Sequence, residues 1–296
     1  MVEFKGVITA IVTPLADQDK LDVDALEELI HFQTKHEVNG FFVSGTMGEG
    51  IILNLDTRKK LLEKTLEFAG TKAFTIFHAG SARIREVMDL ISYAADLGVD
   101  AVATFPPIYY PYDKEALVDY YIQVSSLHDI PFFIYNIPSR TGINIGAELV
   151  RRIIGKSSNV VGIKDSSGDL KNTLKYLSIE NFMVFMGSDT LSLPGLIIGC
   201  RGVVSALSNI VPELFVQMYK LLQSKKIVEA HQIYKKILKL KEILGKYPYV
   251  ASYKVALSTR GLQIKNIVNK PLRSLNTEEI ESLKGEIAGI LKDLTR

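Results

Sequence analysis

Residues 160–169, VVGIKDSSGD, join a buried apolar strand to a lysine at the point where the strand ends. Val160 to Ile163 predict a strand, and Lys164 follows where another apolar residue would continue it. Lysine side chains are seldom buried without a partner, so this stretch alone leaves two explanations open. Either the strand reaches the surface at Lys164, or the lysine lies in a desolvated pocket as an uncharged, nucleophilic amine.

The stretch belongs to the sixth of eight apolar runs that predict strands, with amphipathic patterns typical of helices between them. The runs begin at residues 6, 40, 73, 100, 131, 159, 182 and 202. This alternation predicts parallel βα units, and eight units are what a closed (β/α)8 TIM barrel requires. An open doubly wound sheet is the alternative, but the sequence contains neither GxGxxG nor GxxxxGK[ST]. We expect an α/β barrel over residues 1–224 and a C-terminal helical extension over residues 225–296.

The overall composition excludes several classes of partner. The 35 Lys and Arg residues nearly balance the 33 Asp and Glu residues, and no block of like charge occurs, so no nucleic-acid partner is expected. Cys200 is the only cysteine, which excludes an intramolecular disulfide and a thiolate metal cluster. No apolar run approaches the ~20 residues of a membrane span, and the first residues lack the features of a signal peptide. We therefore expect a soluble, cytoplasmic protein.

The histidines give no sign of a metal site. All five are scattered along the sequence without a paired HxxxH or HExxH motif. Only His78 follows a predicted strand, and there a hydrogen-bonded structural role is expected. We expect neither a metal nor a cofactor, so side chains must carry the chemistry, and the amine of Lys164 is the available nucleophile.

Polar residues gather after the predicted strands, where the active sites of such barrels lie. The glycine-rich turn at residues 44–50 offers hydroxyl and N–H groups that suit a carboxylate or phosphate, although a tight turn alone explains it equally well. Tyr135 is either a rim aromatic or a proton relay. The candidate residues from these turns are Gly45, Thr46, Met47, Tyr135, Arg140, Lys164, Gly187, Ser188 and Asp189.

Several separated motifs resemble the dihydrodipicolinate synthase / N-acetylneuraminate lyase superfamily of class I, pyruvate-dependent aldolases. The resemblance covers nearly the whole chain. It is carried by Thr13-Pro14, Gly45-Thr46-Met47-Gly48-Glu49, Tyr135-Asn136-Ile137-Pro138, Gly162-Ile163-Lys164-Asp165 and Gly187-Ser188-Asp189. It implies a (β/α)8 barrel with C-terminal helices, a homotetramer built as a dimer of dimers, and a lyase that forms a Schiff base between Lys164 and pyruvate.

The resemblance also implies roles for individual residues. Tyr135 would shuttle protons, and Thr46, with the backbone N–H groups of its turn, would hold the carboxylate of pyruvate. Tyr109, in the aromatic run PPIYYPY, would lie near a subunit contact and reach a neighbouring active site. Dry walls would lower the pKa of the lysine by desolvation, and the residues expected to form them are Val161, Ile163, Val203 and Val204.

The markers for the aldehyde conflict. Arg140 matches the arginine with which dihydrodipicolinate synthases bind the carboxylate of aspartate semialdehyde. Met47 replaces a second hydroxyl residue that, by the resemblance, links two tyrosines in the proton relay. The loop at residues 107–112 is more similar to those of sugar-acid lyases and 2-keto-3-deoxygluconate aldolases, and Ser188 and Asp189 could receive sugar hydroxyls.

Met47 would interrupt a mechanism, whereas Arg140 only adds an anion site. We therefore expect an aldolase that reversibly cleaves 2-keto-3-deoxygluconate to pyruvate and glyceraldehyde. The alternative is a 4-hydroxy-tetrahydrodipicolinate synthase, which condenses pyruvate with aspartate semialdehyde. A pyruvate-binding barrel without catalysis and a phosphate-dependent barrel enzyme are more distant alternatives.

Overall fold

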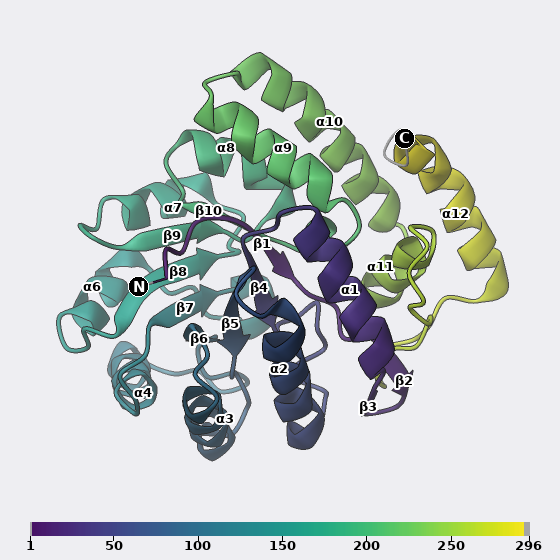
Figure 1. The fold of residues 1–296 in the computed structure, drawn as a ribbon. Helices are drawn as coiled ribbons and strands as arrows, with labels where there is room; N and C mark the ends of the chain where they lie inside the picture. The colour runs from purple at the N-terminus through teal and green to yellow at the C-terminus, as the bar shows by residue number, and fades with distance from the viewer. Residues whose placement is uncertain (1, 293–296) are drawn as a thin grey trace.

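Eight parallel strands close into a barrel in the computed structural model, which describes residues 2–292 (Figure 1). β1 pairs with β4 on one side and with β10 on the other, which closes the ring. All eight predicted strands are confirmed, and with them the (β/α)8 class. The barrel strands are β1 (Gly6–Ala10), β4 (Gly40–Val43), β5 (Phe74–His78), β6 (Ala101–Thr104), β7 (Phe132–Asn136), β8 (Val160–Asp165), β9 (Met183–Met186) and β10 (Gly202–Ser205).

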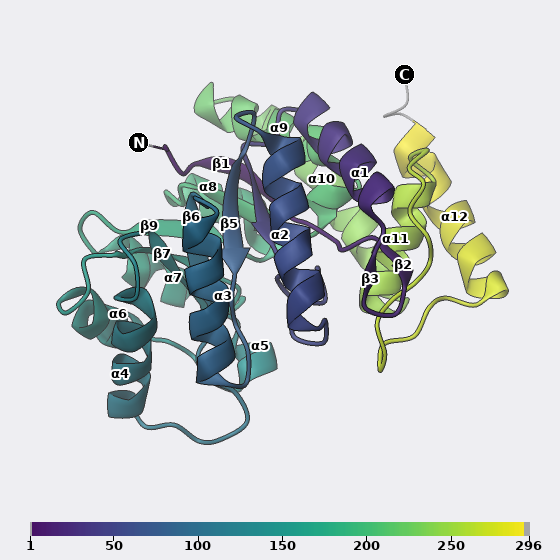
Figure 2. The ribbon, with the colours of Figure 1, turned by 60° about the horizontal axis from the view of Figure 1, so that its bottom comes forward.

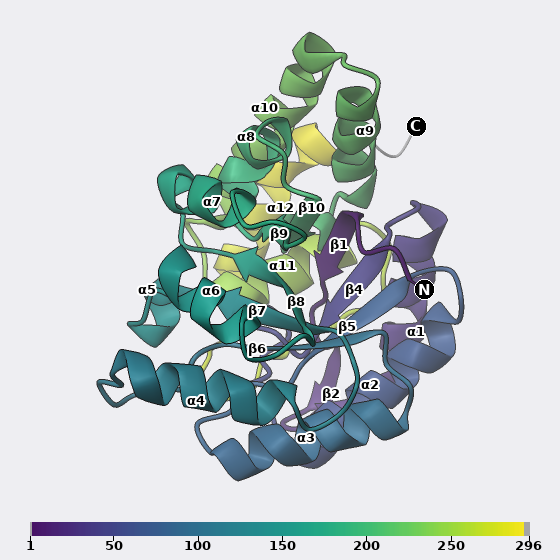
Figure 3. The same ribbon diagram turned by 90° about the vertical axis from the view of Figure 1, so that its left-hand side faces the viewer.

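Helices α1 to α4 lie along the outside of β1, β4, β5 and β6 (Figure 3). Short polar side chains begin several of them, as in α2, where the Asn54 side chain accepts a hydrogen bond from the Thr57 N–H. Gly70 and Gly98, with φ of 51° and 71°, follow α2 and α3, where glycine readily adopts a left-handed conformation. The helices of the barrel are α1 (Val23–Lys35), α2 (Leu55–Ala69), α3 (Ile84–Asp96), α4 (Lys114–Ser125), α6 (Ala147–Ile154), α7 (Leu170–Leu177), α8 (Ser192–Ile197) and α9 (Pro212–Gln223).

Three further helices form the expected C-terminal extension, α10 (Ile227–Leu244), α11 (Tyr249–Ser258) and α12 (Thr277–Lys292). Figures 1 and 2 both show α11 between the barrel and α12, which is the outermost helix. The division of the chain after residue 224 stays a prediction. None of the helices within residues 2–292 combines the length and the apolar character needed to cross a bilayer.

Several short elements escape the sequence patterns. A hairpin of β2 (Leu15–Asp17) and β3 (Lys20–Leu21) follows β1, and α5 (Pro138–Thr141) follows β7. Two 3-10 helices, η1 (Asp189–Leu191) and η2 (Leu207–Asn209), follow β9 and β10. Each has five residues or fewer, which is too short for a period of two or 3.6 to become visible.

An aromatic layer fills the barrel below the predicted site. The ring of Phe133 lies 5.3 Å from that of Phe4 and 5.7 Å from that of Phe185, with edge-to-face geometry in both pairs. Phe185 is the register partner of Lys164 on the neighbouring strand. The barrel is therefore packed at this level, and the polar residues lie at the carboxyl ends of the strands.

Candidate active site

Lys164 is buried, with only 4% of its surface exposed. Its Nζ lies 3.9 Å from the ring centroids of both Phe42 and Tyr135. Burial lowers the pKa of the Lys164 ammonium to about 7, and the nearby charge of Asp189 opposes part of this shift. Of the two explanations left open by the sequence, the strand that reaches the surface at Lys164 is wrong, because the side chain is buried. The role of the amine as a nucleophile stays a prediction. Near pH 7 a substantial fraction of this amine is uncharged and able to attack a carbonyl carbon.

Tyr135 lies beside Lys164 because the two residues are register partners on β7 and β8. The Tyr135 hydroxyl lies 3.3 Å from Oγ1 of Thr46. Burial raises the pKa of Tyr135, while hydrogen bonds to Thr46 and Ser166 lower it by a smaller amount. The phenol is therefore protonated near neutral pH, and it can pass a proton between the amine pocket and Thr46.

The turn at residues 44–50 is fixed at its first residue. Ser44 has a φ of 60°, in the left-handed region. Arg58 Nε donates a hydrogen bond of 2.8 Å to Ser44 Oγ, and Arg58 Nη2 donates one of 2.7 Å to the carbonyl of His78. The Nδ1 of His78 lies 3.0 Å from the Ser44 carbonyl. Burial lowers the pKa of His78 to about 3, so the ring is neutral and Nδ1–H is the donor. The structural role expected for His78 is confirmed.

A cavity of about 320 Å³ opens above this turn. Gly45 and Thr46 from the turn line this cavity, and so does Arg140 from α5. The C-terminal extension supplies part of the wall through Tyr249 and Leu272. Arg140 Cζ lies 5.7 Å from the ring centroid of Tyr249, so the cation and the aromatic face are adjacent. The cavity therefore joins barrel and extension residues, which the sequence did not predict.

The residues after β9 are held by local contacts outside this lining. A Cβ on Gly187 would lie 2.1 Å from Oγ of Ser166, so any larger residue there would displace the Ser166 hydroxyl. Ser188 Oγ lies 2.9 Å from Thr190 Oγ1. The buried carboxylate of Asp189 accepts a hydrogen bond of 2.5 Å from Ser205, and burial raises its pKa. Because Ser188 and Asp189 already have these partners, the structure gives little support to their predicted role with sugar hydroxyls.

Met47 is buried, and the hydroxyl that lies 3.3 Å from the Tyr135 phenol belongs to Thr46. Tyr135 therefore has a hydroxyl partner although residue 47 is a methionine. That Met47 interrupts the relay stays a prediction. Val203 and Val204 are both buried on β10. As successive strand residues they point to opposite sides, so only one of them can face the barrel axis.

Tyr109 lies outside the cavity lining, with 89% of its surface exposed. Its φ of 82° is in the left-handed region, and its ring packs edge-to-face on that of Tyr110, with centroids 4.9 Å apart. A single chain therefore does not bring Tyr109 to the pocket of Lys164. Within residues 2–292, no cluster of three or more His, Cys, Asp or Glu side chains is arranged to hold a metal ion.

The site also contains residues that the sequence-based reasoning missed. Phe42 covers one side of Lys164, and Ser166 hydrogen-bonds to Tyr135. Phe42 belongs to the predicted strand GFFVSG, where alternation separates Phe41 from Phe42 without showing which of them faces the axis. No sequence pattern connects Tyr249 to the site, because it lies more than a hundred residues from Tyr135.

Comparison with known proteins gives one family over nearly the whole chain. Residues 3–289 match the family model of the dihydrodipicolinate synthetase family. The 4-hydroxy-tetrahydrodipicolinate synthase of Thermosipho africanus is 36% identical over 290 residues, which cover 95% of this chain and 98% of that protein. The crystal structure of the Thermotoga maritima dihydrodipicolinate synthase superposes with a TM-score of 0.90 at 31% identity, covering 97% and 98% of the two chains. A solved structure of a monomeric dihydrodipicolinate synthase variant gives 0.89 at 31% identity, also over 97% and 98%.

The matched family accounts for both the barrel and the motifs that surround Lys164. The comparisons name dihydrodipicolinate synthases more often than any sugar-acid aldolase, so they favour the alternative reading of the sequence over the first one. They leave the subgroup open, since one relative, from Thermococcus onnurineus, is described only as an uncharacterized DapA-like lyase. The chain belongs to the dihydrodipicolinate synthetase family and is a lyase of the pyruvate-dependent, class I aldolase type.

Proposed function

We propose that Lys164 forms a Schiff base with pyruvate and that the resulting enamine attacks an aldehyde. The observation that carries this proposal is the buried amine of Lys164, whose pKa is lowered to about 7 between the rings of Phe42 and Tyr135. Uncharged Nζ adds to the keto carbon of pyruvate, and the former carbonyl oxygen leaves as water. The protonated imine then accepts the electron pair released when a methyl C–H bond breaks, which gives the enamine.

Proton transfer in these steps falls to Tyr135. Its hydroxyl can protonate the leaving oxygen and can return a proton to the alkoxide that forms when the enamine carbon bonds to the aldehyde. The hydrogen bond to Thr46 Oγ1 supports this role because it orients the phenol. Thr46 and the N–H groups of its turn suit the carboxylate of pyruvate.

For the aldehyde, we propose aspartate semialdehyde, which makes the chain a 4-hydroxy-tetrahydrodipicolinate synthase. Arg140 lies on the cavity wall, where a guanidinium can bind a carboxylate. The case for 2-keto-3-deoxygluconate depended on Met47, whereas Thr46 gives Tyr135 a hydroxyl partner. The names of the relatives support the same choice.

Borohydride trapping tests the first part of the proposal. Reduction in the presence of pyruvate should attach a reduced pyruvate to the peptide that contains Lys164, and Lys164→Ala should abolish both the label and turnover. A label on another lysine, or turnover in this variant, would contradict the proposed chemistry. Labelling of Lys164 together with turnover in the wild type would contradict the alternative of a pyruvate-binding barrel without catalysis.

An aldehyde panel tests the second part. We expect kcat/KM to be highest for aspartate semialdehyde and to fall on the order of 10²-fold or more in Arg140→Ala, because the carboxylate of the aldehyde loses its partner. Arg201→Ala is the matched control, since Arg201 lies at the opposite end of the barrel and pairs with Glu3. A preference for glyceraldehyde that survives Arg140→Ala would restore the sugar-acid aldolase.

We further propose that the enzyme is a homo-oligomer, and by family likeness a homotetramer. The exposed rings of Tyr109 and Tyr110 support this proposal, because contiguous apolar surface of this kind commonly marks an interface. In this arrangement Tyr109 would act in the cavity of a second copy.

A further inference from the structure

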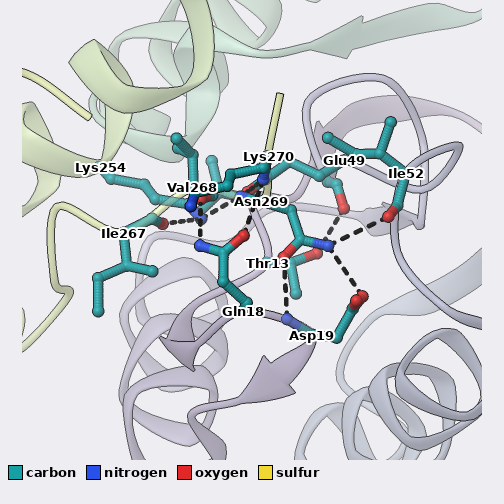
Figure 4. Close-up of polar contacts among 12 residues, drawn as sticks. Thr13, Gln18, Asp19, Glu49, Ile52, Lys254, Ile267, Val268, Asn269 and Lys270 are labelled. Carbon is teal, nitrogen blue, oxygen red and sulfur yellow. Dashed lines mark hydrogen bonds and ion pairs between the residues drawn. The ribbon is translucent and has the colours of Figure 1, made fainter. Parts of the chain in front are cut away.

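Glu49 and Lys254 form an ion pair in which both side chains are fully buried, with 2.5 Å between Lys254 Nζ and Glu49 Oε1 (Figure 4). Glu49 lies near the end of the turn at residues 44–50, three residues after Thr46, and it also lines the cavity. Lys254 lies on α11 of the extension. The pair therefore joins the turn that carries Thr46 to a helix that is 205 residues away in sequence.

The extension supplies one further hydrogen bond to each partner of the pair. Glu49 Oε2 accepts a hydrogen bond of 2.6 Å from the backbone N–H of Asn269. Lys254 Nζ donates a second one, of 2.6 Å, to the carbonyl of Ile267. Figure 4 shows these groups converging from the turn and from the segment around Asn269. The carboxylate is thus held from two sides by groups of the extension.

The hydrogen-bonded groups of Glu49, Lys254 and Asn269 form a junction between the turn and the extension. Asn269 connects this junction to two further segments. Its side-chain amide donates to Asp19 Oδ1 at 2.8 Å and to the Ile52 carbonyl at 3.1 Å. Its side-chain oxygen accepts a hydrogen bond of 2.9 Å from the Asp19 N–H. Three segments meet here: the β2–β3 hairpin, the chain just after the turn, and the extension. The junction is polar and held by several hydrogen bonds, which restrict its geometry.

The position of the pair indicates a role beyond stability. A buried ion pair is often no more stabilising than apolar residues of similar volume, since both charges lose their hydration. Here the pair acts on a turn that already has a second anchor, because Arg58 and His78 hold Ser44 at the other end. Thr46 lies between the two anchors, and Glu49 has a φ of 59°, a conformation that needs support from its surroundings.

We propose that Glu49 and Lys254 are positioning residues, through which the C-terminal extension holds the turn in the shape that receives the carboxylate of pyruvate on Thr46. This inference rests on the proposed function, since it assigns the carboxylate site to that turn. Neither residue touches the reacting atoms. Their effect is on the geometry of Thr46, which lies three residues before Glu49 in the same turn.

The double variant Glu49→Gln/Lys254→Met tests the inference. It removes both charges together, so neither is left buried and unpaired, and the oxygen of the glutamine can still accept from Asn269. We expect the KM for pyruvate to rise on the order of 10- to 100-fold, as small displacements of binding groups do. kcat at saturating pyruvate should fall much less, because Lys164 and Tyr135 lie on strands that the junction does not contact.

The matched control is Glu213→Gln/Arg260→Met. Arg260 and Glu213 form another ion pair that ties the extension to the barrel, at 2.7 Å, with side chains 4% and 22% exposed. Arg260 also donates to the carbonyl of Ile210, away from the turn. A comparable fall in Tm with an unchanged KM for pyruvate is expected in this control. The contrast separates a positioning effect from a general loosening of the extension.

The readout is the pyruvate concentration that gives half-maximal borohydride labelling, measured beside KM. An equal half-saturating concentration in wild type and in Glu49→Gln/Lys254→Met would overturn the inference while leaving the Schiff base intact. Absence of labelling in the wild type would overturn the proposed function, and the inference with it. If the double variant does not fold, Glu49→Asp provides the same test, because it keeps the charge but withdraws the carboxylate by one methylene. An unchanged KM in Glu49→Asp would then count against the inference.

Discussion

Lys164 gains its reactivity from the two rings that exclude water from its amine. Replacing Phe42 by Ala should admit water, and the pKa of Lys164 should then rise from about 7 toward the 10.5 of a solvated lysine. The uncharged amine forms as pH rises through this pKa, so the pH midpoint of borohydride labelling should move upward in the variant. The measurement is the labelling rate between pH 6 and 10 at saturating pyruvate. An unmoved midpoint would show that Phe42 does not set the pKa.

The hydroxyl of Tyr135 can be removed without disturbing the ring that packs on Lys164. In Tyr135→Phe we expect kcat to fall by roughly 10²-fold or more, the scale of general acid–base catalysis, while pyruvate still binds. Tyr121→Phe is the control, because the buried Tyr121 hydroxyl has no hydrogen-bond partner among the described residues. Equal kcat values in the two variants would reduce Tyr135 to a wall residue.

At this scale the sequence drew attention to the buried polar residues of the candidate site but not to the residues around them. Lys164, Tyr135 and Thr46 interrupt or follow apolar strands, and a polar residue in such a place is a strong signal in a barrel. The contact between Thr46 and Tyr135 could not be assigned to residue 46 rather than 47 in advance, because adjacent residues in a tight turn point in different directions, which a linear sequence does not show. Phe42 was missed for a similar reason, since an apolar residue on a strand gives no sign of its face.

Among the elements, strand β9 is followed by Gly187, where an added side chain would meet the hydroxyl of Ser166. Gly187→Ala would place a Cβ 2.1 Å from Oγ of Ser166, which hydrogen-bonds to Tyr135. We expect this overpacking to cost about 1–3 kcal/mol in the free energy of unfolding and to lower activity through Ser166. Urea denaturation of the variant and the wild type measures the cost.

Gly285→Ala provides the matched control for that experiment. Gly285 is exposed within α12, and a Cβ there meets nothing within 4 Å. Alanine in a helix interior is favoured over glycine by roughly 0.5–1 kcal/mol, so this variant should be slightly more stable than the wild type. Equal effects of the two substitutions would contradict the steric explanation for Gly187.

The long helices and strands could be predicted from the sequence, whereas the short ones could not. In the eight barrel strands and the helices around them, apolar residues recur with the period of the element, because one face is buried along its length. The β2–β3 hairpin and α5 are too short for such a pattern, yet they carry residues that matter to the site, Asp19 and Arg140. Their conformations depend on contacts with the extension and the cavity, which form only in the folded chain.

For the whole molecule, the contribution of the extension to the cavity was the feature least visible in the sequence. The resemblance implied C-terminal helices, but it did not connect them to the wall formed by Tyr249 and Leu272. Contacts such as that between Glu49 and Lys254 span 205 residues, and without a set of related sequences nothing pairs the two positions in advance. The extension is therefore better regarded as part of the active site than as an addition to the barrel.

The last prediction concerns how many chains build one active site. Tyr109 is too exposed to act within its own chain, so we expect it to complete the cavity of a second copy. Sedimentation at micromolar concentration should show an oligomer, and Tyr109→Phe should lower activity without dissociating it. A fully active monomer would contradict this prediction.

Mixing an inactive variant with one of lowered activity tests the same prediction more sharply. Lys164→Ala chains lack the amine but keep Tyr109, whereas Tyr109→Phe chains lack the phenol but keep Lys164. If Tyr109 acts in a second copy, mixed oligomers contain some sites with Lys164 from one chain and Tyr109 from the other, so activity should exceed the sum of the separate variants after they are unfolded and refolded together. If both residues serve the same chain, each mixed oligomer has only defective sites and no activity is gained. Because the two substitutions lie on different chains, recovery requires the residues to meet across an interface.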